Sequence, residues 1–183
     1  INKASFSTSV HGKNACDSCH KDIEEYPHPK KSSPISCETC HRAKADLFLN
    51  SDHGKKIVEI LSGPKICLSC HGEAHSLRNS KDKTSPVNRK NTIGTCNSCH
   101  IKKTMDTKMS IIKAQSYATY AKTIHGRAFL ENNIEKSAIC SDCHGTHDLN
   151  FVSNSEGRLA KFNVPQTCGR CHKSEKVVYD TSI

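Results

Sequence analysis

Apolar residues are sparse along this chain, and one stretch stands out because its apolar positions recur at near-helical spacing. Residues 110–121, SIIKAQSYATYA, are predicted to form the longest helix of the protein. Residues 79–95 are polar and contain Pro86 and Gly94, a pattern typical of a loop. The sequence has no run of about 18 apolar residues, so it predicts no transmembrane segment.

The composition does not support an ordinary hydrophobic core. Hydrophobic residues make up 34% of the 183 residues, aromatic residues 5%, and mean hydropathy is −0.62. A typical globular chain is about 45–50% apolar. Such a chain is expected to stay disordered unless something other than side chains supplies apolar surface. The chain starts at Ile1 rather than Met, and we interpret it as a mature form without its signal segment.

All twelve cysteines fall in six CxxC pairs, and a histidine follows each pair directly. In chain order, motifs one to six are Cys16-Cys19-His20, Cys37-Cys40-His41, Cys67-Cys70-His71, Cys96-Cys99-His100, Cys140-Cys143-His144 and Cys168-Cys171-His172. Structural zinc sites and disulfide scaffolds also use many cysteines, but neither needs a histidine after every pair. CxxCH is the attachment signature of c-type haem, in which both thiols add to haem vinyl groups and the histidine binds the iron. The sequence therefore predicts six covalent haem c groups.

The remaining histidines match the second axial positions of six haem irons in number. They are His11, His28, His53, His75, His125 and His147. Methionine is the usual competitor for this position, but the chain has only Met105 and Met109, both in a polar stretch. We therefore expect two histidine ligands on every iron.

The six remaining histidines also reveal an internal repeat. His11, His53 and His125 each open an HG-basic sequence before a CxxCH motif, and we call them the leading histidines. His28, His75 and His147 each follow that motif and precede another; we call them the trailing histidines. The pattern predicts three two-haem modules, 1–50, 51–122 and 123–183. Modules two and three match best, because most equivalent positions are 72 residues apart.

The spacing of some histidines carries geometric information. His71 and His75 are four apart, so on a helix they would share one face. The two ligands of one iron lie on opposite sides of the porphyrin, so His75 is expected to serve a different haem from His71. His147, three residues after His144, repeats this arrangement. His28 stands between two prolines, which favours an extended segment or a simple turn.

These motifs resemble those of the multihaem c-type cytochromes, in particular the class that includes the small tetrahaem cytochromes of sulfate reducers. The resemblance covers nearly the whole chain through the CxxCH, HG-basic and CHG-x-H elements. It implies mostly irregular coil with short α-helices wrapped around a stack of covalent haems, and little or no β-sheet. It also implies attachment of haem outside the cytoplasmic membrane, at the cell surface or extracellularly, with the periplasm as the alternative.

The net charge of +9 changes meaning once haems are included. Haem propionates and ferric iron bring the holoprotein to about +3 when oxidised and about −3 when reduced. The basic residues then mostly compensate propionates, so we expect no nucleic-acid binding.

The leading functional hypothesis is an electron carrier without catalytic residues, working with redox partner proteins or an extracellular electron acceptor. Related proteins include periplasmic shuttles and subunits of extracellular conductive filaments, and the motifs leave both open. A multihaem reductase with one open iron is the enzymatic alternative. For a filament, we expect each leading histidine to bind a haem of the preceding module. His11 has no preceding module, so it would reach another copy head-to-tail.

Overall fold

The computed structural model describes residues 1–23, 33–100 and 116–182. Within these ranges the chain forms only helices, most of them one to three turns long. They are α1 (Lys3–Ser7), η1 (Cys16–Ser18), α2 (Glu38–Asn50), α3 (Asp52–Val58), α4 (Lys65–His71), η2 (Ala74–Ser76), α5 (Arg89–His100), α6 (Ser116–Lys122), α7 (Ile124–Leu130), α8 (Cys140–His144), α9 (Val164–Gly169) and α10 (Lys173–Thr181). Short helices joined by irregular segments, without any strand in these ranges, confirm the predicted fold class.

The structure bears on two predicted elements, the helix over 110–121 and the loop over 79–95. Residues 116–121 are helical as expected, while 110–115 lie outside the described residues, as do Met105, Met109 and His28. The longest described helix is α2, with 13 residues. The loop predicted over 79–95 is wrong at its end, because α5 begins at Arg89. The Asn88 side chain accepts a hydrogen bond from the Lys90 amide at 3.1 Å, so this polar sequence supplies its own helix cap.

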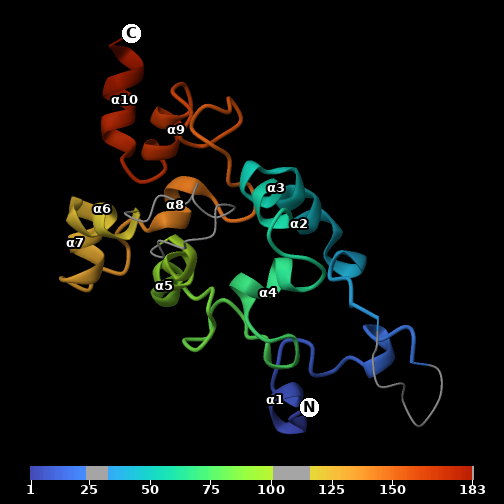
Figure 1. Ribbon diagram of the computed structural model, residues 1–183. Coiled ribbons are helices and arrows are strands. Elements are labelled where there is room, and N and C mark those ends of the chain that lie inside the picture. The colour runs from blue at the N-terminus through green and yellow to red at the C-terminus, as the bar shows by residue number, and fades with distance from the viewer. Residues whose placement is uncertain (24–32, 101–115, 183) are drawn as a thin grey trace.

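The helices follow one another across the molecule, and the two termini lie at opposite ends (Figure 1). The sequence runs from α1 at the N-terminal end, through α2 to α5 in the middle, to α9 and α10 at the C-terminal end. The neighbouring helices α2 and α3, α6 and α7, and α9 and α10 pack in pairs. Such a chain can place its motifs along a line rather than around one centre.

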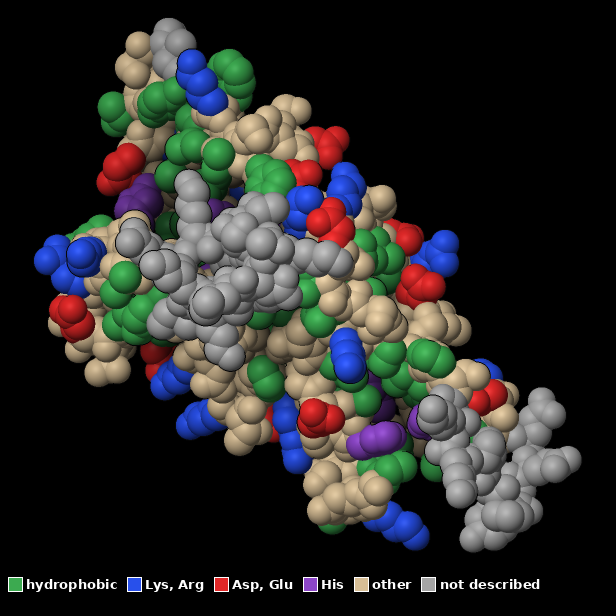
Figure 2. Space-filling model, in the orientation of Figure 1, with side chains coloured by type: hydrophobic (Ala, Val, Ile, Leu, Met, Phe, Trp, Pro, Cys, Tyr) green, Lys and Arg blue, Asp and Glu red, His purple; other side chains and the backbone are tan. Residues whose placement is uncertain are grey.

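The side chains form almost no core of their own. Among the described residues, the buried hydrophobic side chains are Ile93, Ile139 and Ala160. Large apolar side chains such as Phe162, which is 86% exposed, lie open instead, and Figure 2 shows apolar patches scattered between charged ones. The apolar surface that an ordinary core would provide must therefore come from another source.

The second halves of modules two and three repeat each other in atomic detail. Asn91 donates its side-chain amide to the carbonyls of Lys83 and Ser85, and Asn163 does the same to residues 155 and 157. Thr95 and Thr167 likewise each donate a side-chain hydrogen bond to a carbonyl nine residues before. Every one of these partners is offset by 72 residues, so the repeat in the sequence is also a repeat in local structure.

Candidate haem sites

Each leading histidine lies in a turn that begins with the same local arrangement. An aromatic residue stands five positions before the histidine, and a serine or threonine two positions before it. Ser51 and Thr123 accept hydrogen bonds from the amides of Gly54 and Gly126 at 3.0 Å, capping α3 and α7. At His11, Ser9 accepts from the histidine's own amide at 3.3 Å.

The glycine after each leading histidine is required by a close backbone approach. A Cβ on Gly54 would stand 1.8 Å from the Phe48 carbonyl oxygen, and one on Gly126 would stand 2.0 Å from that of Tyr120. On Gly12 it would stand 2.5 Å from the carbonyl oxygen of Phe6. The HG pair therefore allows one chain segment to turn tightly over the preceding helix and fixes the histidine beside it. The sequence signal, aromatic-x-x-[Ser/Thr]-x-His-Gly, was present in all three modules and was missed.

Ten of the eleven described histidines form five pairs of facing imidazole rings. The ring centroids are separated by 5.9 Å in His11–His41, 6.0 Å in His20–His75, 6.4 Å in His53–His100, 5.9 Å in His71–His147 and 5.9 Å in His125–His172. Each pair joins one CxxCH histidine to one leading or trailing histidine.

This separation fits an iron between two imidazoles. Two metal–nitrogen bonds of about 2 Å each, plus about 1 Å from nitrogen to ring centre on either side, place the centroids about 6 Å apart. The buried Nδ1 atoms of His20 and His53 also lack a hydrogen-bond partner. Such unpaired nitrogens are costly in a finished protein unless a bound group compensates them. The residues present therefore suit a haem in each pair.

The pairs also differ in the angle between their ring planes. His20–His75, His53–His100 and His71–His147 are close to parallel, at 17°, 16° and 13°. The pairs of His11 and His125 are tilted, at 47° and 53°.

The pairing corrects the expected role of the leading histidines. His11 faces His41 of its own chain and module, so it is not available to bind a haem of another copy. His53 and His125 also face the second motif of their own modules, His100 and His172, rather than a motif of the preceding module. The tight glycine turn is the physical reason, since it folds the leading segment back onto its own module.

The trailing histidines follow the opposite rule. His75 faces His20 of module one, and His147 faces His71 of module two. Each therefore meets the first motif of the module before its own. The expectation that His75 and His71 belong to different pairs agrees with these contacts. Glycines with positive φ after the motif histidines, Gly72 at 90° and Gly145 at 88°, direct the chain away.

His144 is the one motif histidine without a facing histidine among the described residues. His144 is the last residue of α8. The only histidine not yet placed is His28, which lies outside the described ranges.

The thiols place motifs two to six in a row. All twelve cysteines are free, so none forms a disulfide. Burial, followed by the neighbouring Cys37 thiol, raises the pKa of Cys67 to about 11. A hydrogen bond between the thiols of Cys96 and Cys140 lowers the pKa of Cys140 to about 7. These contacts bring motif two beside three, and motif four beside five.

The other steps of the row rest on weaker electrostatic contacts. Burial mainly raises the pKa of Cys70, and nearby Cys99 adds to the rise. Burial likewise raises the pKa of Cys143, with a smaller effect from Cys168 of motif six. Motif three therefore adjoins four, and five adjoins six, so neighbouring sites in the sequence are neighbours in space.

Burial lowers the pKa of five histidines in these pairs and motifs: His53, His71, His100, His144 and His147. A lowered pKa keeps an imidazole neutral at pH 7. The neutral ring is the form that binds metal, so the folded chain presents ligands in the correct protonation state.

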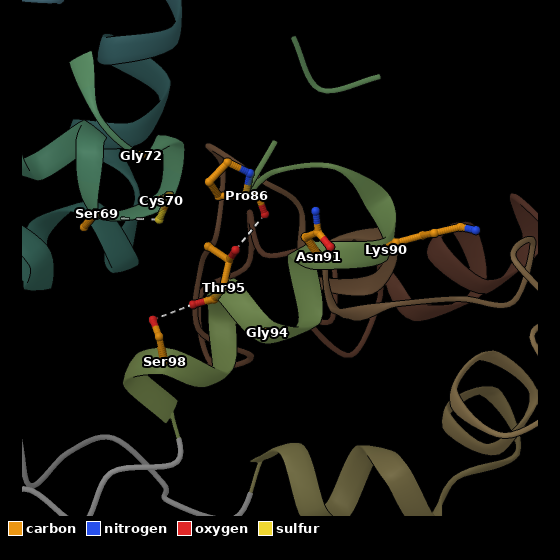
Figure 3. A pocket seen from close by; sticks show the side chains of 9 residues that line it. All are labelled: Ser69, Cys70, Gly72, Pro86, Lys90, Asn91, Gly94, Thr95 and Ser98. Carbon is orange, nitrogen blue, oxygen red and sulfur yellow. Dashed lines mark hydrogen bonds between the residues drawn. The ribbon is translucent and has the colours of Figure 1, made fainter. Parts of the chain in front are cut away.

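A cavity of about 490 Å³ lies between α4 and α5, within the usual size range of ligand sites. In Figure 3 its walls come from both motifs, with Cys70 on one side and Gly94, Thr95 and Ser98 on the other. A second cavity of about 240 Å³ is lined mostly by residues offset by 72 from these, including Thr167 and Arg170. The repeat therefore includes a cavity beside motif four and an equivalent cavity beside motif six.

Facing imidazoles beside CxxCH motifs, on short helices with almost no side-chain core, define a multihaem c-type cytochrome. The family model "Outer membrane cytochrome MtrC/MtrF-like, domains II/IV" matches residues 8–182, and the chain belongs to this family. No curated protein and no solved structure matches the chain. None of the described helices is long and apolar enough to cross a membrane.

Proposed function

We propose that the chain binds six haem c groups and carries single electrons along them, as one unit of an extracellular filament. The observation that supports this most is the row of motifs two to six, with a facing histidine pair at every described site except motif five. The cysteines of each motif hold the porphyrin, and its histidine binds the iron. When bound, the haems supply reversible one-electron chemistry.

The chain's own residues would set the spacing and the potentials. Electron tunnelling requires short distances between cofactors, and Cys96 and Cys140 lie next to each other, so motifs four and five are neighbours. Two imidazoles per iron leave no position for a substrate, and they give lower potentials than a methionine ligand would. An acid, base or nucleophile is not needed.

The family of outer membrane cytochromes supports a place at the cell surface, facing redox partners or an extracellular acceptor. A filament fits a chain whose ends lie on opposite sides of the molecule (Figure 1) and whose motifs two to six are successive neighbours in space. A monomeric periplasmic shuttle would use the same haem row, so the two differ in assembly rather than in chemistry.

The test uses the holoprotein from a host with haem-attachment machinery. Intact mass should show six haem additions, and reductive titration should consume six electrons per chain. Electron microscopy should show filaments. Fewer haems, or haem-free protein that retains zinc, would contradict the cofactor assignment, while monomers with six haems would contradict the filament alone.

A second candidate is a reductase with one open iron at motif five. It is favoured by a single observation, which is that His144 has no facing histidine within the described ranges. Rapid binding of carbon monoxide by one reduced haem in every assembly state would support this candidate.

A further inference from the structure

The positive charge of the chain is concentrated in one of its three modules. Module two carries 13 basic and 5 acidic residues, module one carries 7 and 6, and module three carries 7 and 7. Modules one and three are therefore close to neutral, and module two accounts for nearly all of the net charge of +9. Within the described ranges, module two still has nine basic and four acidic residues.

The proposed haems do not remove this difference, because every module would hold two of them. Two haems bring about four propionate charges, which leaves the reduced modules at about −3, +4 and −4 in chain order. The middle module of the holoprotein is then positive, and both outer modules are negative. Compensation of propionates explains the average charge of the chain, but it does not explain this distribution.

The described part of the excess is dense in residues 78–91, which lead into α5 and include its first turn. We call these residues the basic segment. It contains five basic residues and one acidic residue, Asp82. The Asp82 carboxylate accepts hydrogen bonds from the amide and the hydroxyl of Thr84, at 2.8 and 2.7 Å, so it is used within the turn. Figure 2 shows several Lys and Arg side chains gathered below α5.

Residues 150–163 of module three form the same turns with far less charge. The amides of Ser85 and Gly157 each donate to the carbonyl three residues before, at 3.0 and 2.8 Å. The side chains of Asn91 and Asn163 then close the two segments with equivalent pairs of hydrogen bonds. Module three has two basic residues and one acidic residue in this range. The backbone arrangement therefore does not depend on the additional basic residues.

The two segments differ at three positions where module two has an exposed lysine. A serine or a phenylalanine stands at each equivalent position of module three: Ser153 for Lys81, Ser155 for Lys83 and Phe162 for Lys90. A CxxCH motif follows both segments at the same distance. Neither the turns nor haem attachment therefore accounts for the three lysines, because module three has both without them.

The charge of these lysines is largely available to a partner. The Lys90 side chain is 55% exposed and pairs with Glu135 at 2.7 Å. The pKa of Glu135 is lowered first by its hydrogen bond with Lys90 and to a smaller extent by Lys83, so these two lysines lie close together. Lys81 and Lys83 form no ion pair with any other described residue. Exposed lysines without a paired carboxylate suit an acidic surface outside the chain.

The basic segment also borders the haem motifs in the middle of the row. Lys90 lines the cavity between α4 and α5 together with Cys70 of motif three and Ser98 of motif four. In Figure 3 the Lys90 side chain extends away from Cys70 along the outside of α5. A protein bound to this segment would lie beside motifs three and four, and short distances are what electron tunnelling requires.

We propose that the basic segment is the docking surface for an acidic redox protein, which exchanges single electrons with the haems of motifs three and four at the side of the row. The inference rests on the proposed haem-binding function and specifies the partner for it. One electron leaves the reduced partner and converts one ferric haem to ferrous, and no bond forms or breaks. The lysines attract an acidic surface over about 10 Å at 0.1 M salt and so speed up the encounter.

The decisive comparison is between two triple variants of the holoprotein that have the same net charge. One removes three charges from the basic segment, and the other removes three exposed charges from module one: Lys81→Gln, Lys83→Gln and Lys90→Gln against Lys3→Gln, Lys13→Gln and Lys21→Gln. The probe is reduced plant-type ferredoxin, an acidic one-electron donor, mixed with the oxidised holoprotein in a stopped-flow instrument. At low salt the first variant should be reduced about tenfold more slowly than wild type, and the second within about twofold. Equal rates in the two variants would overturn the proposal.

A small anionic oxidant, hexacyanoferrate(III), tests the charge at the point of exchange. The reduced holoprotein has a net charge of about −3, so a uniform distribution would repel this ion, and added salt would speed the reaction. Exchange at the basic segment predicts the opposite, with a rate that falls about tenfold between about 10 and 500 mM salt. A rate that rises with salt would place the exchange at the negative modules and contradict the proposal. Attraction of hexacyanoferrate alone, with unchanged ferredoxin rates in the first variant, would leave a patch for small anions and no docking surface.

Reductive titration separates the docking surface from the haem assignment. Both variants should hold six haems and accept six electrons, because the substituted side chains are exposed and bind no haem. Fewer than six haems in the wild type would contradict the proposed function itself. Six haems, with wild-type rates in the variant of the basic segment, would contradict the docking surface alone.

Discussion

The first and the second motif of a module obtain their facing histidine from different places. Each second motif, at His41, His100 or His172, meets the leading histidine of its own module. The first motifs at His20 and His71 meet the trailing histidine of the next module. The second motif thus closes a module, and the first motif joins modules. Among the described residues, the first motif of module three, at His144, has no facing histidine.

The largest effect is expected from removing the haems, because the histidine pairs within modules and those between modules would both lose the iron that joins them. With Ile93, Ile139 and Ala160 as the buried hydrophobic residues of the described ranges, side chains alone cannot offset the conformational entropy of folding. Expressed without the haem-attachment machinery, the chain should show no cooperative thermal transition by circular dichroism. A cooperatively folded apoprotein would contradict this account of the core.

Gly54→Ala should break the link that closes module two. Its new Cβ would stand 1.8 Å from the Phe48 carbonyl oxygen, so the leading turn must open and displace His53. We expect a loss of about 3 kcal/mol in stability and one haem that becomes partly high-spin. Denaturant titration and the visible spectrum measure the two effects. Lys55→Arg, which introduces the residue found in module three, should change neither.

His147→Ala should break a link between modules while leaving each module closed. One iron, at motif three, loses its facing imidazole and should become high-spin and open to carbon monoxide. Loss of the ligand should also loosen module three from module two. Hydrogen exchange should then speed up at the Leu149 junction, where the His53 amide donates, and remain unchanged at His125. Uniform exchange across both sites would mean that the modules are not separate units.

Asp142→Asn should weaken the same boundary by a smaller amount. Arg89 of α5 forms two hydrogen bonds with the Asp142 carboxylate of α8, at 2.8 and 3.1 Å. Both side chains are more than a third exposed, so we expect a loss of about 1 kcal/mol. Glu59→Gln removes the exposed pair of Lys56 with Glu59, the residue that follows α3, and is the control, with almost no expected effect.

The Asp142 variant should also change the dependence of stability on pH. Burial raises the pKa of Asp142, but the hydrogen bonds and charge of Arg89 more than offset this, so the pKa lies below 3.8. A carboxyl with a lowered folded pKa stabilises the protein fully above its unfolded pKa of 3.8. That contribution disappears as the pH falls through the folded value. The acid-induced loss of stability should therefore be smaller in Asp142→Asn than in wild type.

The smallest expected effect is a difference between haems in the spectrum of the unmodified ferric protein. The angle between the two imidazole planes sets the splitting of the iron orbitals, and therefore the low-temperature electron paramagnetic resonance spectrum of the ferric protein. Three pairs are near parallel and should give ordinary rhombic signals. The tilted pairs at His41 and His172 should give signals with a larger principal g value. A single class of signal would contradict the angles.

Local spacing in the sequence predicts the haem attachment motifs, but it does not predict which histidine faces each motif. Cys96, Cys99 and His100 are recognisable as a haem motif because the chemistry of attachment acts within five consecutive residues. The partner of His100 is 47 residues away, at His53, and no local pattern indicates it. For His11, the short gap to Cys16 correctly predicted that it does not face His20 of the adjacent motif. The expectation that it binds a haem of another copy was wrong, because it faces His41 of its own chain.

The sequence by itself determined the cofactor class, the short-helix architecture and the repeat of about 72 residues. Each follows from covalent spacing or from a composition too polar for a core. Only the tertiary structure decided which histidine faces which motif, because ring pairs form between segments that the turns at Gly12, Gly54 and Gly126 bring together. The direction of the trailing histidines was decided in the same way. Their partners depend on how module packs against module, which is a property of the folded chain rather than of any single motif.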